Sequence, residues 1–500
     1  MKATLIALML GCVLTLFVSS PALTHAAEIE IRFDNDCTID NCVPTSPANG
    51  VAFRPSVNPP DPRLGGPAQQ LTFEPQGSDV RNRHVFDLVR IEVASGFLNV
   101  GIQYAAGDIA VYNNVGPGTW PLPDGRNIDR VTLEEIGGGF VVRSLVIEPV
   151  PDAPVRFIAL GDTGTGDNNQ RGVAQALKKW CTRHGCSFAL LLGDNFYETG
   201  VMSCKDSQFN TKFETPYKPL GIPFFAALGN HDYGNGDPYW WARAGDQYQY
   251  AGADGKYKEC MPDPKDWIWS GNWRMGAAGT DPYRYYTFQQ GNVRFLALDT
   301  TPMVATAWQD DPQKGNGTGK QSTYVKTQQE FLDAAMGSTH AWKIAFGHHP
   351  YVSNGRHGNA GSYDDHSGTK CRGVTPDSDA GWQCGLQVKT SIEKLCAKGL
   401  DLYLSGHDHN LQWLVANCGS RPMDFIVSGA GAKLTGCDGD SDPEFCKQNQ
   451  DKTLFQLRER GFVYIVIAGQ RMDVSIVQAK LGNRPEDAEV EVPFARLRSK

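Results

Sequence analysis

The stretch "FALLLGDNFYETG", residues 188–200, decides the fold of this chain and points to its chemistry. Its opening run, Phe188 to Leu192, is entirely apolar, which is typical of a strand buried on both faces of a sheet. The run ends at Gly193, and Asp194 and Tyr197 follow it. A buried strand that ends in an acid and a phenol predicts an α/β sheet with functional groups beyond the carboxyl ends of its strands.

Four other apolar runs end in the same way. They are "VRFIALGDTG" with Asp162, "FFAALGNHD" with Asn230 and His231, "KIAFGHHP" with His348, and "DLYLSGHDH" with His407 and His409. A glycine before each polar tip lets the backbone turn sharply and approach a bound group. A single polar tip, meaning the polar residues that directly follow a strand, usually belongs to a turn or a helix cap. Five tips that offer carboxylate, amide, phenol and imidazole groups instead predict a metal site for iron, manganese or zinc.

The pattern of apolar and polar residues along the chain predicts the domain organisation. Residues 27–150 alternate apolar and polar positions with Gly, Asn and Asp at the breaks, which predicts a small all-β accessory domain. Prolines crowd residues 148–154 and mark a linker. In residues 151–500 solid apolar runs alternate with helical patterns such as "NNQRGVAQALKKWCTRHG", so we expect an α/β catalytic domain there.

The first 26 residues have the pattern of a secretory signal peptide. Lys2 gives a positive start, an apolar run from Leu5 to Val18 follows, and small residues precede Ala27. An uncleaved anchor is the alternative. We therefore expect a secreted or periplasmic protein, and no later segment is long and apolar enough to span a membrane.

The charge and the cysteine content indicate which partners and which cross-links to expect. The formal net charge of −8 predicts no nucleic-acid partner. Thirteen cysteines become twelve when Cys12 leaves with the signal peptide, and an even number in an exported protein predicts disulfides. A zinc site is the alternative, but no cysteine pair has the spacing of a zinc knuckle. Short separations favour four pairs: Cys37–Cys42, Cys181–Cys186, Cys371–Cys384 and Cys437–Cys446.

The order of the five polar tips resembles that of the purple acid phosphatases, a branch of the calcineurin-like metallophosphoesterases. The motifs "GDNFYETGV", "GNHD", "GHHP" and "SGHDHNLQWL" are especially similar to the small, tartrate-resistant type, over roughly residues 155–478. Most calcineurin-like enzymes carry a metal-binding histidine where this chain has Gly164, and Tyr197 would supply the missing ligand. The resemblance implies an α/β fold, a calcineurin-like β-sandwich of two mixed sheets flanked by helices. Here the small all-β N-terminal domain would precede it.

Carried over position by position, the resemblance implies two metal ions that share Asp194. The first, iron(III), would bind Asp162, Asp194, Tyr197 and His409. The second, a divalent iron, manganese or zinc ion, would bind Asp194, Asn230, His348 and His407. His231 and His357 would be the catalytic histidines that stabilise the transition state or protonate the leaving group.

The activity that the resemblance implies is that of a secreted acid phosphatase, in which a metal-bound hydroxide attacks a small phosphate monoester. Two alternatives remain open at this point. One is a metal-dependent phosphodiesterase that acts on nucleotides or phospholipid head groups. The other is an inactive binding protein that keeps the metallophosphatase shell. The sequence does not identify a partner for the N-terminal domain.

Overall fold

The structure is a computed structural model of the whole chain. It describes residues 2–9, 12–19, 29–32, 53–58, 70–75, 86–104, 109–115, 118–121, 128–149, 154–235, 240–276, 284–304, 319–365, 367–376, 378–437, 445–446 and 448–499. The chain divides into two compact units. The first comprises Met1–Arg156, Ile465–Ser475 and Ala495–Lys500, and the second comprises Phe157–Tyr464 and Ile476–Phe494.

The elements described before the linker are all strands. They are β1 (Lys2–Met9), β2 (Cys12–Ser19), β3 (Ile29–Arg32), β4 (Phe53–Asn58), β5 (Gln70–Pro75), β6 (Phe86–Tyr104), β7 (Ile109–Val115), β8 (Gly118–Pro121) and β9 (Ile128–Pro149). These nine strands form one sheet. Val100 and Ile102 of β6 and Val131 and Leu133 of β9 are buried at alternate positions, as expected for strands with one covered face.

Two predictions about this region stay predictions. The segments that connect the strands lie outside the described residues, so the all-β character of residues 27–150 is not tested. The signal peptide is not tested either, since the structure shows only that two segments of it, β1 and β2, pair antiparallel.

Two seven-stranded sheets carry the rest of the chain. The first has the order β13-β12-β11-β10-β21-β22-β23 and the second the order β14-β15-β16-β17-β19-β18-β20. The first consists of β10 (Val155–Leu160), β11 (Phe188–Leu192), β12 (Phe224–Ala227), β13 (Trp273–Arg274), β21 (Gly461–Ala468), β22 (Arg471–Lys480) and β23 (Glu489–Ser499). The second consists of β14 (Tyr286–Gln290), β15 (Val293–Ala297), β16 (Trp342–Phe346), β17 (Leu402–Ser405), β18 (Leu411–Cys418), β19 (Arg421–Ser428) and β20 (Thr453–Leu457).

Both sheets are mixed, as predicted. Strands β10 to β13 run parallel to one another, and so do β15, β16, β17 and β19. Strands β14 and β18 pair antiparallel with their neighbours, and a two-residue turn makes β21 and β22 antiparallel.

A cluster of phenylalanines joins the two sheets into a sandwich. The ring of Phe157 on β10 lies 5.2 Å from that of Phe295 on β15, and Phe188 on β11 lies 5.3 Å from the same ring. Phe225 on β12 stacks on Phe288 of β14 at 3.8 Å. Because these pairs link strands of different sheets, the sandwich expected from the sequence is confirmed.

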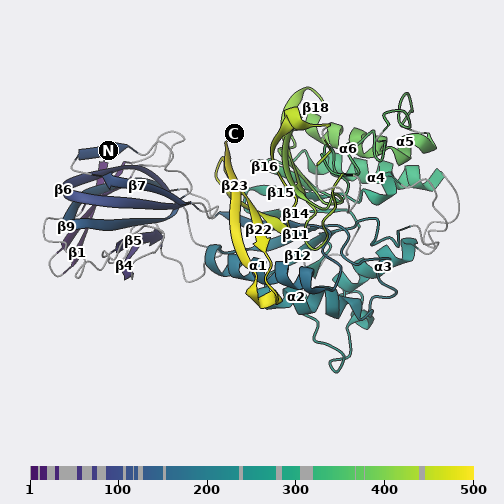
Figure 1. Ribbon diagram of the computed structural model, residues 1–500, viewed down its shortest axis with the longest axis horizontal. Helices are drawn as coiled ribbons and strands as arrows, with labels where there is room; N and C mark the ends of the chain where they lie inside the picture. Colours follow the sequence, from purple (N-terminus) through teal and green to yellow (C-terminus); the bar gives the residue numbers. More distant parts are fainter. Residues whose placement is uncertain are drawn as a thin grey trace. The chain divides into compact units, whose positions relative to one another are not determined.

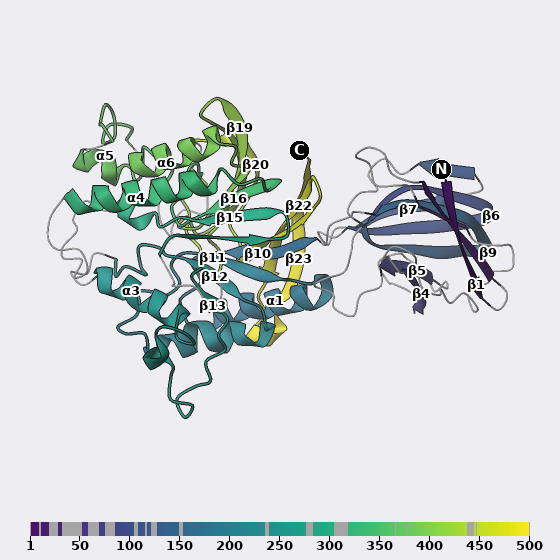
Figure 2. The same ribbon diagram turned by 180° about the vertical axis from the view of Figure 1, so that it is seen from behind.

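Helices cover the outer faces of the sandwich (Figures 1 and 2). They are α1 (Asn168–His184), α2 (Thr215–Tyr217), α3 (Trp240–Ala251), α4 (Gly319–Ala335), α5 (Asp379–Gln383) and α6 (Leu386–Ala397). Short helical turns lie at η2 (Asn210–Glu214), η3 (Lys218–Leu220), η4 (Lys258–Cys260), η5 (Thr301–Met303), η6 (Gln450–Lys452) and η7 (Pro485–Asp487).

Helix α1 was predicted from its sequence pattern. Asp167 caps its first turn by accepting a hydrogen bond from the backbone N–H of Gln170, and Gly185 ends it with a φ of 76°. Its buried face packs on the first sheet, where Trp180 meets Tyr464 of β21. On the other side, buried side chains of α4 and α6 pack over the second sheet.

Three of the predicted disulfides are confirmed: Cys181–Cys186, Cys371–Cys384 and Cys437–Cys446. Cys37 and Cys42 lie outside the described residues. Two further pairs, Cys204–Cys260 and Cys396–Cys418, join cysteines 56 and 22 positions apart and were not predicted. None of the helices in the described ranges has the length and apolar character needed to cross a membrane.

Candidate metal centre

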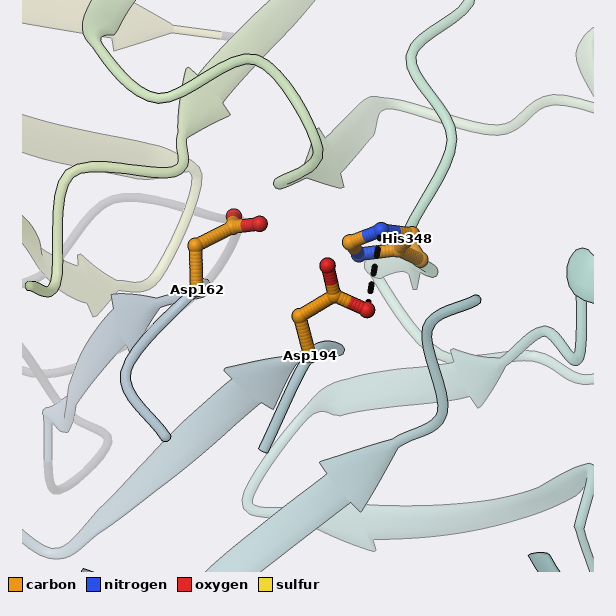
Figure 3. A group of neighbouring side chains, drawn as sticks. All are labelled: Asp162, Asp194 and His348. Atoms are coloured by element: carbon orange, nitrogen blue, oxygen red, sulfur yellow. Dashed lines mark ion pairs between the residues drawn. The ribbon is translucent and has the colours of Figure 1, made fainter. Parts of the chain in front are cut away.

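The polar tips of both sheets meet at one edge of the sandwich. Asp162 follows β10, Asp194 follows β11 and His348 follows β16, and their ligand atoms all lie within 4.8 Å of one another. Nε2 of His348 is 3.4 Å from Oδ1 of Asp194, and the carboxylate of Asp162 lies near this pair (Figure 3). All three residues are buried. The centre therefore takes residues from both sheets.

Tyr197 and His409 complete one group of donor atoms with Asp162. The phenol oxygen of Tyr197 lies 3.0 Å from Oδ1 of Asp162 and 3.2 Å from Nε2 of His409. The same nitrogen of His409 lies 3.5 Å from Oδ1 of Asp162. These three atoms thus surround one point.

A second group of donor atoms surrounds Nε2 of His348. Oδ1 of Asn230 and Nδ1 of His407 each lie 3.0 Å from this nitrogen. With Oδ1 of Asp194 they form a second cluster of one carboxylate, one amide and two imidazoles. Asp194 also interacts with the Tyr197 phenol, so it neighbours both groups. The structure therefore brings all seven predicted ligand residues together.

The spacing within each group fits a bound metal ion. Ligand atoms at about 2.1 Å from an ion are about 3.0 Å apart at the edges of an octahedron and about 3.4 Å apart in a tetrahedron. The observed separations of 3.0 to 3.5 Å agree with these values. The donor types also suit first-row metals. The residues present fit two ions with Asp194 between them.

Three residues of the centre have positive φ angles, which are ordinarily found in glycine. Asp162, Asp194 and His407 have φ angles of 58°, 53° and 69°, a region that non-glycine residues rarely adopt. Such conformations gather at functional sites, where the surrounding structure holds them in place. Neighbouring glycines leave the space that this needs: a Cβ at Gly229 would lie 2.1 Å from Oδ1 of Asp194, and one at Gly406 2.6 Å from Oδ2 of Asp162.

Two imidazoles are oriented by a bond at the nitrogen that faces away from the centre. Nδ1 of His348 lies 2.9 Å from the carbonyl oxygen of Leu192, and Nδ1 of His409 lies 2.7 Å from the hydroxyl of Thr435. Such bonds fix ring orientation in metal sites and leave Nε2 for the ion. The hydroxyl of Thr300, just after β15, accepts a hydrogen bond from the backbone N–H of His348, and no local sequence pattern predicted this contact.

Burial and neighbouring groups shift the pKa values of several residues of the centre. Burial alone would raise the pKa of Asp162, but the hydrogen bond and charge of His409 and the charge of His348 lower it below its usual value. Burial and neighbouring histidines lower the pKa of His407 well below its usual value, which keeps that imidazole neutral. Burial and the carboxylates of Asp162 and Asp194 raise the pKa of Tyr197 well above its usual value. Buried carboxylates beside neutral imidazoles are the donor set that a metal ion binds.

The two predicted catalytic histidines lie on the rim of the centre. Nε2 of His231 is 3.9 Å from Oδ2 of Asp194, while its Nδ1 is 2.6 Å from the carbonyl oxygen of Glu198. The ring of His357 stacks on that of His407 at 3.9 Å, and its Nδ1 is 2.8 Å from Oδ1 of Asp364. Burial would lower the pKa of His357, but the bond to Asp364 and nearby acids raise it above its usual value.

Two buried aspartates that the ligand prediction did not include hold the loops of the centre. Asp232 accepts backbone N–H groups of Asn195, Phe196 and Gly229, so it fixes the turn that joins Asp194 to Tyr197. Burial and the charge of Asp194 raise the pKa of Asp232 to about 7. Asp408 accepts the hydroxyl of Ser353 and the backbone N–H of His357. Sequence alone gives Asp232 no distinguishing signal beyond its place beside His231, and gives Asp408 none beyond its place between two ligands.

Known proteins with a similar sequence or fold include several phosphatases. The family model described as "Calcineurin-like phosphoesterase" matches residues 155–411. The chain is 27% identical over 296 residues to "Purple acid phosphatase 17" of Arabidopsis thaliana, covering 57% of this chain and 71% of that protein. It is 26% identical over 356 residues to "Tartrate-resistant acid phosphatase type 5" of Rattus norvegicus, covering 66% and 88%. The solved structure of a purple acid phosphatase from yellow lupin (Lupinus luteus) seeds matches with a TM-score of 0.40 and 14% identity, covering 97% and 81%.

Proposed function

Because this chain belongs to the calcineurin-like phosphoesterase family, we propose that it is a secreted acid phosphatase that hydrolyses small phosphate monoesters at a dinuclear metal centre. One observation carries the proposal: two groups of donor atoms, one with Tyr197 and one with Asn230, share Asp194. The names of the relatives, which are acid phosphatases, support the same reaction class. The disulfides and the signal-like N-terminus support secretion.

The two groups of ligands favour different ions. Asp162, Asp194 and Tyr197 offer anionic oxygen donors beside the imidazole of His409, a set that suits iron(III). Asn230, His348 and His407 offer neutral donors beside Asp194, which suit divalent iron, manganese or zinc. Two bound ions would supply positive charge for the phosphate oxygens and Lewis acidity for the attacking water.

The chain's own residues would bind the ester and move a proton. His231 and His357 face the centre from its rim, where a substrate phosphate would meet them. An imidazole that carries a proton can bind a phosphate oxygen or donate that proton to the leaving alcohol. The raised pKa of His357 supports the protonated form at the acidic pH at which such an enzyme would work.

A metal analysis paired with a visible spectrum of the purified protein tests the proposal. Two metal ions per chain and a broad visible band would support it, because a tyrosinate on iron(III) absorbs visible light. Turnover of 4-nitrophenyl phosphate well above that of bis(4-nitrophenyl) phosphate, with an optimum below pH 7, would support the monoesterase. A metal-loaded protein that prefers the diester would replace it with the phosphodiesterase, and one with no turnover of either ester would favour the binding protein.

A further inference from the structure

The ring of His357 stacks on His407 and is hydrogen-bonded to Asp364, and these two contacts constrain the ring in different ways. Its ring stacks on the ring of His407 with the two planes 27° apart. A half-turn of the His357 ring about its Cβ–Cγ bond would preserve this stack but would exchange Nδ1 with Cδ2 and Nε2 with Cε1. Stacking therefore leaves two ring orientations open, and only a hydrogen bond to one nitrogen can select between them.

Asp364 provides that hydrogen bond. Its Oδ1 lies 2.8 Å from Nδ1 of His357, and its own backbone N–H donates to the carbonyl oxygen of His357 at 3.1 Å. The two residues are thus tied by a side-chain bond and a backbone bond across seven positions. With Nδ1 engaged by Asp364, Nε2 is the nitrogen left for a substrate.

The backbone of Asp364 adopts a conformation that serves this contact. Its φ is 54°, which is uncommon for a residue with a side chain but is tolerated by Asp and Asn. Its side chain is 53% exposed, so packing in a core does not dictate its place. Asp365, the next residue, differs: its carboxylate accepts backbone N–H groups of Thr369 and Cys371 within the turn.

The other rim histidine is held at the same nitrogen by different means. Nδ1 of His231 lies 2.6 Å from the backbone carbonyl oxygen of Glu198. Both rings are therefore held at Nδ1. The partner of His357 is a side chain, and it can be changed without altering the backbone.

We propose that Asp364 is a positioning residue for His357: its carboxylate selects the ring orientation that presents Nε2 to the leaving group of the substrate. This inference rests on the proposed phosphatase function. It assigns to Asp364 no contact with substrate or metal. Its effect on catalysis is carried through the imidazole of His357.

Three variants of the mature, metal-loaded enzyme test this role. Asp364→Gly keeps the positive φ accessible and removes the acceptor. Asp364→Asn keeps an acceptor oxygen and tolerates the same φ, so it should restore the orientation. Asp365→Asn is the matched control, an adjacent carboxylate that bonds to the turn. Each is assayed with ethyl phosphate, whose leaving group needs a proton, and with 4-nitrophenyl phosphate, whose leaving group needs none.

The expected result is selective. Since general-acid catalysis contributes about 10²–10⁴-fold, Asp364→Gly should lower kcat for ethyl phosphate by about 10-fold or more. KM, metal content and turnover of 4-nitrophenyl phosphate should change little. Asp364→Asn should recover most of the loss, and Asp365→Asn should behave as wild type with both substrates. An equal loss with both substrates, an equal loss in the Gly and Asn variants, or a matching loss in Asp365→Asn would overturn the inference.

A second measurement does not depend on activity. In metal-free protein labelled with ring-¹⁵N histidine, the His357 signals are identified by their absence in His357→Ala. They should report one fixed tautomer in wild type and Asp364→Asn, and an average of two in Asp364→Gly. An unchanged tautomer in Asp364→Gly would overturn the inference. If wild type hydrolysed neither ester, the proposed function would fail, whereas this comparison would still decide the role of Asp364.

Discussion

Gly229 lies against Asp194 so closely that a Cβ at Gly229 would be 2.1 Å from Oδ1 of the aspartate. It would also lie 2.4 Å from the backbone nitrogen of Asp194, which cannot turn aside. The absence of a side chain at position 229 is therefore a condition for the position of Asp194. Because Asp194 neighbours both groups of donor atoms, this contact bears on both.

Gly229→Ala should for this reason weaken the binding of both proposed metal ions together. Displaced or misoriented ligands in metal sites typically cost about 10–100-fold in metal affinity. Metal content after dialysis against a weak chelator measures the effect. Gly255→Ala is the control, because the nearest atom to its Cβ would be the carbonyl oxygen of Gly252 at 3.8 Å. Full retention of both metals in Gly229→Ala would contradict the shared role of Asp194.

Much of the centre was predictable because its signal is local. A run of apolar residues identifies a buried strand, and the residues just after it must lie at the carboxyl end of that strand. Strands β10, β11 and β12 in one sheet, and β16 and β17 in the other, gave such signals. Asp299 and Thr300 also follow a buried strand, β15. They were not predicted because no glycine precedes them, whereas a glycine precedes the polar residues after the other five strands.

The residues that support the centre were less predictable because their partners are distant in the sequence. Asp232 reaches back to Asn195, and Thr435 reaches His409 across 26 positions. The disulfide Cys204–Cys260 spans 56 positions. Such contacts depend on how the loops pack in the folded chain, and no local pattern of residue types encodes them.

The two rim histidines should be needed for turnover and not for metal binding. His231→Ala and His357→Ala each remove an imidazole that lies beside the donor groups, so we expect losses in the range of about 10²–10⁴-fold with metal content retained. His340→Ala is the control, because His340 precedes β16 and His348 follows it, at the opposite end of the strand. Full activity of both variants on an alkyl phosphate would show that the roles are wrongly assigned.

Asp299 should make stability depend on pH in a defined direction. Burial raises its pKa to about 6, although the hydroxyls of Tyr233 and Tyr324 donate to it and oppose the shift. The ordinary pKa of an aspartate carboxyl is 3.8, so between about pH 4 and 6 the folded chain holds a proton that the unfolded chain has released. A raised carboxylate pKa contributes stability that is full below the unfolded pKa and is lost as pH rises through the folded pKa.

The test compares wild type with Asp299→Asn, whose side chain does not titrate. From pH 4 to pH 7 the unfolding free energy of wild type should fall relative to that of the variant, on the order of 2–3 kcal/mol at about 1.4 kcal/mol per pKa unit. Chemical denaturation of the metal-free proteins measures this difference. Asp266→Asn, at an exposed position, should run parallel to wild type. A difference that stays constant with pH would mean that Asp299 is ionised throughout this range.

Tyr197 gives the prediction that separates a purple phosphatase from a generic dimetal esterase. In the metal-free protein its phenol is held protonated, because burial and the carboxylates of Asp162 and Asp194 raise its pKa well above its usual value. Only a strongly Lewis-acidic ion in the same group of donors would reverse this and hold the phenolate. Since the other proposed ligands are carboxylate, amide and imidazole groups, the visible band of the iron(III) protein must come from this one side chain.

Tyr197→Phe should therefore bleach the band and weaken iron(III) binding by about 10-fold or more, while activity measured with fresh metal falls less. Tyr233→Phe, which alters a buried tyrosine bonded to Asp299 outside the ligand set, should keep the colour. An unchanged spectrum in Tyr197→Phe would mean that the phenol is a packed aromatic group and that iron(III) has other ligands.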